Sequence, residues 1–97
     1  MKVVINECYG GFGLSEAAKE RYLELTTNTP QHWSDIERND KALVQVVEEL
    51  GIEANGPFAF LRVHDIEAGC WYRIEENCGR EEIKYLYLDN DWQLAVN

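Results

Sequence analysis

The chain has 97 residues, a formal net charge of −9 from 18 acidic and 9 basic residues, and a hydrophobic fraction of 45%. This length fits a single domain over residues 1–97, and the apolar content excludes a disordered chain. The acidic excess excludes ordinary binding to DNA or RNA, which needs a basic face. It is compatible with a basic protein partner or simply with solubility.

Residues 2–6 (KVVIN) predict a short, mostly buried strand, because β-branched residues dominate them. A glycine-rich stretch at residues 6–15 (NECYGGFGLS) ends this strand. Ser15 is placed to cap a helix over residues 15–27, because a serine hydroxyl accepts a hydrogen bond from an N–H of the first helical turn. The side chains expected on one face of this helix are Ala18, Tyr22 and Leu25.

Residues 40–51 (DKALVQVVEELG) predict a second helix. Asp40 or Asn39 caps its start, and Gly51 ends it in a left-handed conformation. Its apolar stripe consists of Leu43, Val44, Val47 and Leu50. The loop before it, residues 26–38, is expected to be anchored to the body of the domain by Trp33 and Ile36.

Residues 57–66 and 70–76 alternate in hydropathy, which predicts two strands that pair as an antiparallel hairpin around a turn at residues 67–69. The polar segment that follows is expected to break the second strand. Residues 83–96 predict a further hairpin, and a helix that begins near Glu81 is the alternative. The predicted fold class is therefore α+β, with a short N-terminal strand, two helices and an antiparallel β-meander. The residues expected to share a face within each strand are Ala59, Leu61 and Val63, and Tyr72 and Ile74.

The glycine-rich stretch and the helix after it make a candidate anion site, because N–H groups at a helix N-terminus point outward and glycine lets a ligand approach closely. Known phosphate fingerprints fail, since no Lys precedes a Ser or Thr at P-loop spacing and Glu16 stands where the dinucleotide pattern needs a glycine. Tyr9 and Phe12 can stack on a planar base. The alternatives are a tight turn whose aromatic rings fill the core, and arginines that pair with the surplus carboxylates. The predicted ligand-binding residues are Tyr9, Gly10, Gly11, Phe12, Gly13, Ser15, Arg38 and Arg73.

No catalytic residue, metal ligand or cofactor is predicted. Neighbouring carboxylates on a helix or strand point in different directions, so the adjacent pairs are expected to form solvated faces rather than an acid–base site. The histidines have no neighbouring Cys or His at zinc-binding spacing. The sequence therefore favours a protein that is not an enzyme. The residues expected to form an acidic docking surface are Glu48, Glu49, Glu81 and Glu82.

The three cysteines, Cys8, Cys70 and Cys78, indicate the compartment. An odd number without paired spacing argues against a disulfide framework and favours a reducing environment. The apolar run at residues 3–5 is too short for a signal peptide, and no segment has membrane-spanning length. We therefore expect a cytoplasmic protein that does not bind membranes.

Three segments, in order along the chain, carry a resemblance: KVVINECYGGFGLSEAA, IERNDKALVQVVEELG and YRIEENCGREEI. On these segments the chain resembles a family of small, functionally uncharacterised proteins encoded by bacteriophages. The C-terminal residues 84–97 depart from the short charged ending of that family. The resemblance implies a phage origin and a setting inside the host cell, and it supplies no catalytic residues.

These observations predict a non-enzymatic binding protein that counters a host defence function. In one form, the glycine-rich loop sequesters a small anionic ligand such as a nucleotide. In the alternative form, the acidic surface mimics nucleic acid and docks on a basic host protein. A small hydrolase is the third hypothesis. Direct binding to nucleic acid is not expected, and a homo-oligomer is left open.

Overall fold

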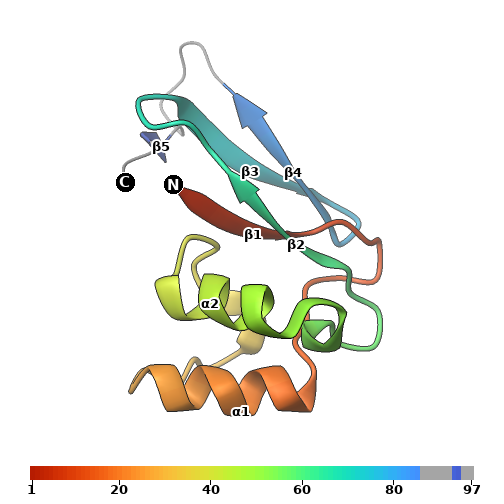
Figure 1. The fold of residues 1–97 in the computed structure, drawn as a ribbon. Helices are drawn as coiled ribbons and strands as arrows, with labels where there is room; N and C mark the ends of the chain where they lie inside the picture. Colours follow the sequence, from red (N-terminus) through yellow and green to blue (C-terminus); the bar gives the residue numbers. More distant parts are fainter. Residues whose placement is uncertain (86–92, 95–97) are drawn as a thin grey trace.

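The secondary structure consists of two main helices set among short strands (Figure 1). A computed structural model describes residues 1–85 and 93–94. Short 3-10 helices precede and follow α2. In chain order, the elements are β1 (Lys2–Asn6), α1 (Glu16–Leu25), η1 (Trp33–Asp35), α2 (Lys41–Leu50), η2 (Gly51–Ala54), β2 (Leu61–Asp65), β3 (Trp71–Asn77), β4 (Arg80–Tyr85) and β5 (Gln93–Leu94).

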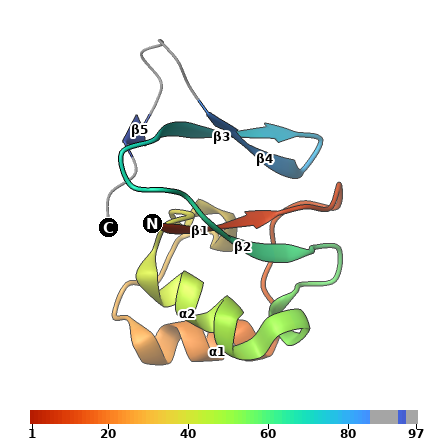
Figure 2. The same cartoon turned by 45° about the horizontal axis from the view of Figure 1, so that its top comes forward.

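The elements stack in layers, which Figure 2 shows one above the other. The helices α1 and α2 form one outer layer, and β1 pairs with β2 as an antiparallel ribbon in the middle. The other outer layer is the sheet with strand order β4-β3-β5. This arrangement confirms the predicted α+β fold class. None of the helices in the described residues is both long enough and apolar enough to cross a membrane.

Strand β1 is buried on both faces, which explains its continuous apolar sequence. Val4 packs into a cluster with side chains of the helices, among them Leu43. Val3 and Ile5 point the other way, into a second cluster with Tyr72 of β3. The strand therefore forms part of both hydrophobic cores and holds the two outer layers together.

Both helix caps are confirmed. The Ser15 hydroxyl accepts a hydrogen bond from the Ala18 N–H at 3.1 Å. Asp40 caps α2 in the same way, with its carboxylate accepting from the Leu43 N–H at 3.1 Å. Gly51 ends α2 with a φ of 57°, the left-handed conformation that favours glycine. Leu43, Val44 and Val47 of α2 are buried, as the apolar stripe predicts. Val46, which was not in the predicted stripe, is also buried, and Leu50 is only partly buried.

The loop between the helices is anchored as expected. Ile36 is buried in the core between the helices and β1. The Trp33 ring meets the Tyr22 ring edge to face, with 5.8 Å between the ring centroids. Burial, and then a hydrogen bond to Asp40, raise the pKa of Tyr22 to about 12. The tyrosine therefore stays neutral and links α1 to the cap of α2.

The alternation within each strand is confirmed, but the predicted pairing of the two strands is wrong. Leu61 and Val63 face the helices, and Tyr72 and Ile74 face β1, as expected. However, β2 pairs with β1, and β3 pairs with β4. Burial explains the choice, because β1 needs a partner whose apolar face lies on the same side as Val4, and β2 provides it.

The segment expected to break β3 is instead its tight turn into β4. Cys78 and Gly79 have φ angles of 53° and 90°, so both central residues are in the left-handed region that a type I′ hairpin turn requires. Asn77 pairs with Arg80 across this turn. A cysteine is unusual at such a position, so the sequence lacks the usual Asn-Gly or Asp-Gly signal.

For the C-terminal segment the sequence left two alternatives, a hairpin over residues 83–96 and a helix that begins near Glu81. Residues 80–85 form β4, so a helix that begins near Glu81 is wrong for these residues. The turn expected near residues 89–91 lies outside the described residues. β5 pairs antiparallel with β3, through Trp71 and Leu94 and through Tyr72 and Gln93.

An ion pair joins the two helices on their exposed side. The Arg21 guanidinium donates to both carboxylate oxygens of Glu49, at 2.8 and 3.2 Å. This arginine, and then a hydrogen bond from Gln45, lower the pKa of Glu49 from 4.5 to about 2. The folded state therefore favours the ionised carboxylate.

We expect an acid-dependent loss of stability from this pair. Because folding lowers the Glu49 pKa, its contribution is complete above about pH 4.5 and is lost as the pH falls toward 2. The variant Arg21→Gln should raise the Glu49 pKa toward its ordinary value, as measured by NMR titration of the carboxyl group. Lys19→Gln, which removes a separate surface pair with Glu16, should leave the Glu49 pKa unchanged. A Glu49 pKa near 4.5 in the parent protein would contradict the assignment.

Candidate functional site

The glycines of the loop after β1 are placed where backbones touch. A Cβ built on Gly10 would lie 2.2 Å from both the Cβ and the carbonyl oxygen of Phe58. Gly79 of the β3–β4 turn is similarly close, since its Cβ would lie 2.6 Å from the Tyr9 carbonyl oxygen. The Gly56 N–H donates to the Gly13 carbonyl at 3.0 Å. Close packing of three chain segments therefore explains Gly10 and Gly79, but a Cβ on Gly11 or Gly13 would have no atom within 4 Å beyond its chain neighbours.

The N-terminus of α1 is covered by the segment that follows α2. Besides capping the helix, the Ser15 hydroxyl donates to the Glu53 carbonyl at 2.6 Å. The Ser15 N–H donates to the Ala54 carbonyl at 2.9 Å. The polar groups of Ser15 are therefore engaged within the protein.

Asn6, at the end of β1, organises the loop and was not among the predicted site residues. Its side chain is fully buried. The Nδ2 group donates to the carbonyls of Cys8 and Gly79 at 2.7 and 2.8 Å, and Oδ1 accepts from the Phe60 N–H at 2.8 Å. A polar residue directly after a buried apolar run is the signal in the sequence that identifies such a position.

A buried ion pair lies beside Asn6. The Glu81 side chain is only 7% exposed, and it accepts a hydrogen bond from the Asn6 N–H at 2.9 Å. Arg38 donates to the same carboxylate from Nε and from a terminal nitrogen, the latter at 2.9 Å. Glu81 is thus a buried residue, so its expected place on an acidic surface is wrong.

Arg38 is also held by its other groups. One terminal nitrogen donates to the carbonyls of Ser34 and Ile36. The guanidinium carbon lies 3.8 Å from the centroid of the Phe12 ring, a cation–π contact. Phe12 and Arg38 are therefore neighbours, as the predicted site requires, but the donors of Arg38 point at protein acceptors.

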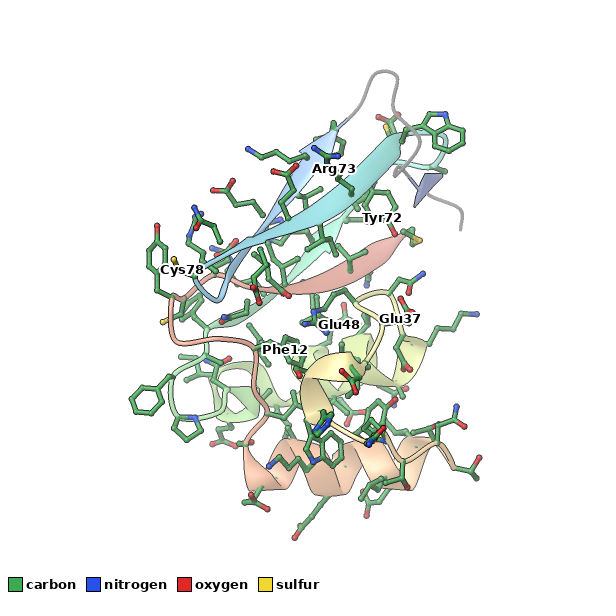
Figure 3. All side chains as sticks on the ribbon, turned by 180° about the vertical axis from the view of Figure 1, so that it is seen from behind. Phe12, Glu37, Glu48, Tyr72, Arg73 and Cys78 are labelled. Atoms are coloured by element: carbon green, nitrogen blue, oxygen red, sulfur yellow. The ribbon has the colours of Figure 1, made fainter. Side chains whose placement is uncertain are left out.

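A cleft of about 530 Å³ separates the loop before α2 from β3. Its lining includes Arg38, Arg73, Tyr72 and Glu37. Figure 3 shows Tyr72 and Arg73 on opposite faces of β3, with Tyr72 toward β1. Burial, and then the charge of Glu37, raise the pKa of Tyr72. Arg73 forms an ion pair with Glu75 on its own strand.

None of the clefts found among residues 1–85 is lined by all of the predicted ligand-binding residues. Arg38 and Arg73 line the cleft beside β3, and Phe12 lies against Arg38. Ser15 lies at the other end of the loop, against η2. Tyr9 is 67% exposed. The glycines lie between these positions, Gly11 with a φ of 97°.

Within the described residues, no group of three His, Cys, Asp or Glu side chains could hold a metal ion. His64 pairs with Glu7, with 2.8 Å between Nε2 and Oε2. Cys8, Cys70 and Cys78 are free thiols.

No protein-family model, curated protein sequence or solved structure matches this chain.

Two glycine variants separate packing from ligand binding. Gly10→Ala should lower the free energy of unfolding by about 1–3 kcal/mol, because the new methyl group would overlap Phe58. Gly13→Ala should change it by less than about 0.5 kcal/mol, because no atom outside its chain neighbours lies within 4 Å of that Cβ position. Urea denaturation measures both. Equal effects at the two positions would contradict the packing role.

The buried ion pair between Arg38 and Glu81 should contribute more to the free energy of unfolding than the exposed ion pairs of Glu82. Glu81→Gln leaves the Arg38 charge without its carboxylate and should lower the free energy of unfolding by about 3 kcal/mol or more. Glu82→Gln breaks only surface pairs with Arg80 and Lys84 and should lower it by less than about 1 kcal/mol. A Glu81→Gln variant as stable as Glu82→Gln would show that the Arg38 pair does not hold the layers.

Proposed function

We propose that this protein is a non-enzymatic binding protein that docks on a basic partner protein through carboxylates. The observation that carries the proposal is the pairing of its cations. Within residues 1–85, ion pairs inside the chain engage every arginine and every lysine except Lys41. The acidic partners are Glu48 for Lys2, Glu16 for Lys19, Glu24 and Glu49 for Arg21, Glu81 for Arg38, Glu7 for Arg62, Glu75 for Arg73, and Glu82 for Arg80 and Lys84.

The surplus charge on the surface is therefore acidic. Several exposed carboxylates form no ion pair with the described residues. Such groups attract cationic partners over a Debye length and speed their association. These carboxylates are Asp35, Glu20, Glu37, Glu53, Glu67 and Glu76.

A small anionic ligand at the glycine-rich loop is the weaker hypothesis. Such a ligand would have to displace Glu81 from Arg38 and Glu75 from Arg73, the two arginines expected to bind it. It would also lie near the unpaired carboxylate of Glu37. Both effects oppose the binding of an anion.

The resemblance to phage proteins supplies the biological part of the proposal. We infer that the partner is a host protein with a basic nucleic-acid site in the cytoplasm, and that the carboxylates occupy it in place of phosphates. This part rests on the resemblance, and the docking on a basic partner rests on the ion pairs.

Two matched sets of charge reversals test the proposal. The first changes Asp35, Glu37 and Glu76 to Lys, and the second changes Glu20, Glu53 and Glu67 to Lys, so that both variants gain the same charge. Immobilised protein is exposed to a nuclease-treated bacterial lysate, and retained proteins are identified by mass spectrometry and purified. We expect the parent to retain basic proteins whose affinity falls steeply with salt. The first set includes Asp35 and Glu37, which line the cleft beside β3. It should therefore weaken binding of the purified partner more than the second set does.

The opposite results would overturn the proposal. Retained proteins that are acidic, or an affinity that ignores both salt and charge reversal, would exclude docking through carboxylates. An affinity that rises in both variants would instead support an anionic ligand.

A further inference from the structure

We propose that the basic partner contributes an extended segment that adds as a strand to β3 at Ile74 and Glu76, along the edge that no strand of residues 1–85 or 93–94 covers. This inference rests on the proposed function and places it on the molecule. The hydrogen-bonding pattern of the β3–β4 hairpin determines which backbone groups of β3 point outward. Because the turn has two central residues, Asn77 and Arg80 form a hydrogen-bonded pair, and such pairs alternate along the strands.

The backbone groups of alternate β3 residues therefore point away from β4. At Tyr72 these groups face β5, which pairs with it through Gln93. At Ile74 and Glu76, no strand of residues 1–85 or 93–94 lies on that side. Their N–H and C=O groups form a row that an extended peptide can pair with.

The edge faces the 530 Å³ cleft, which gives an added strand room. Residues 34–39 form one wall of this cleft, and Tyr72, Arg73, Ile74 and Glu75 form the other. Side chains of a strand alternate between its two faces, so every second residue of the partner would face the loop before α2. That loop carries the exposed carboxylates of Asp35 and Glu37.

Charge complementarity identifies the occupant. Arg38 is compensated by Glu81 and Arg73 by Glu75, so Asp35 and Glu37 give the cleft a net negative charge. A segment in which Lys or Arg alternates with apolar residues fits this wall. An acidic or neutral segment would leave the two carboxylates uncompensated.

The opposite edge of the sheet fits a basic segment less well. Glu81, Ile83 and Tyr85 of β4 also point their backbone groups away from β3. The carboxylates along that edge already have partners in the chain. Glu7 pairs with Arg62 and His64, and Glu82 pairs with Arg80 and Lys84.

The test uses the full chain and a short capped peptide in which lysine alternates with valine. NMR titration gives its affinity, and hydrogen exchange gives the protection of the Ile74 and Glu76 amides. Strand addition should slow exchange of these two amides at least about tenfold at saturation. A peptide of the same sequence with N-methylated backbone amides keeps its charge, but it cannot donate to the β3 carbonyls and should not bind.

Two variants of one residue isolate the backbone bond. Glu76→Pro and Glu76→Gln remove the same charge, but only proline removes the edge N–H. Proline is tolerated there because that N–H makes no bond to β4. Glu76→Pro should bind the peptide about threefold to tenfold more weakly than Glu76→Gln, the value of one hydrogen bond. Tyr85→Pro, on the β4 edge, should leave the affinity unchanged.

Several outcomes would overturn this inference. Equal affinities of the two Glu76 variants, together with unprotected amides in the parent, exclude strand addition at β3. A greater loss with Tyr85→Pro assigns the docking to β4, and binding of the N-methylated peptide shows attraction by charge alone. No binding of the lysine–valine peptide at millimolar concentration also rejects it. In each case the proposed function is tested separately, by the identity of the proteins retained from the lysate and by the salt dependence of their affinity.

Discussion

The arrangement of the layers depends on one buried carboxylate, that of Glu81 on β4. It accepts from the N–H of Asn6 at the end of β1 and from the guanidinium of Arg38 before α2. The Val4 N–H on the same edge of β1 donates to the Arg38 carbonyl at 2.7 Å. The free edge of β1 is thus closed by an arginine carbonyl and a glutamate side chain. A charge this deeply buried is stable only with such partners, so the three segments must meet in one geometry.

This constraint also determines what the surface can do. Because Arg38 is held by Glu81, Phe12 and two backbone carbonyls, an anionic ligand would have to compete with all of these partners. The same pair fixes the loop before α2 beneath β3, and the cleft lies between them. The neighbouring residues Glu37 and Asp35 remain exposed on the wall of that cleft. The interaction that closes the core therefore leaves acidic groups, and not basic ones, beside the sheet edge.

The sequence predicted the local features of the fold but not the long-range ones. Helix ends depend on neighbouring residues, so Ser15, Asp40 and Gly51 could be identified as caps. Strand partners depend on contacts between distant segments. Lys2 pairs with Asp65, and no local pattern states this. The Cys78–Gly79 turn also lacked the usual residues, because a cysteine takes the left-handed conformation there.

The candidate site also depends on contacts between distant segments, which the sequence pattern does not reveal. Glycine, serine and arginine near a helix start are the residue types of an anion site, and also those of a tightly packed junction. The two differ only in what lies opposite: Phe58 against Gly10, the Glu53 carbonyl against Ser15, and Glu81 against Arg38. Each of these partners is distant in sequence, so composition alone could not distinguish the two.

The unequal use of charge connects the fold to the proposed function. Folding pairs the cations locally and leaves a group of carboxylates whose mutual repulsion opposes the compact state. A partner that supplies positive charge relieves this repulsion. The repulsion is present in the free protein, so its relief contributes to the free energy of binding. The gain is largest where unpaired carboxylates lie beside unpaired backbone groups, because a peptide then satisfies both at once. In the described residues that combination is found at the edge of β3, beside Asp35 and Glu37, and not at the edge of β4, where the carboxylates are already paired.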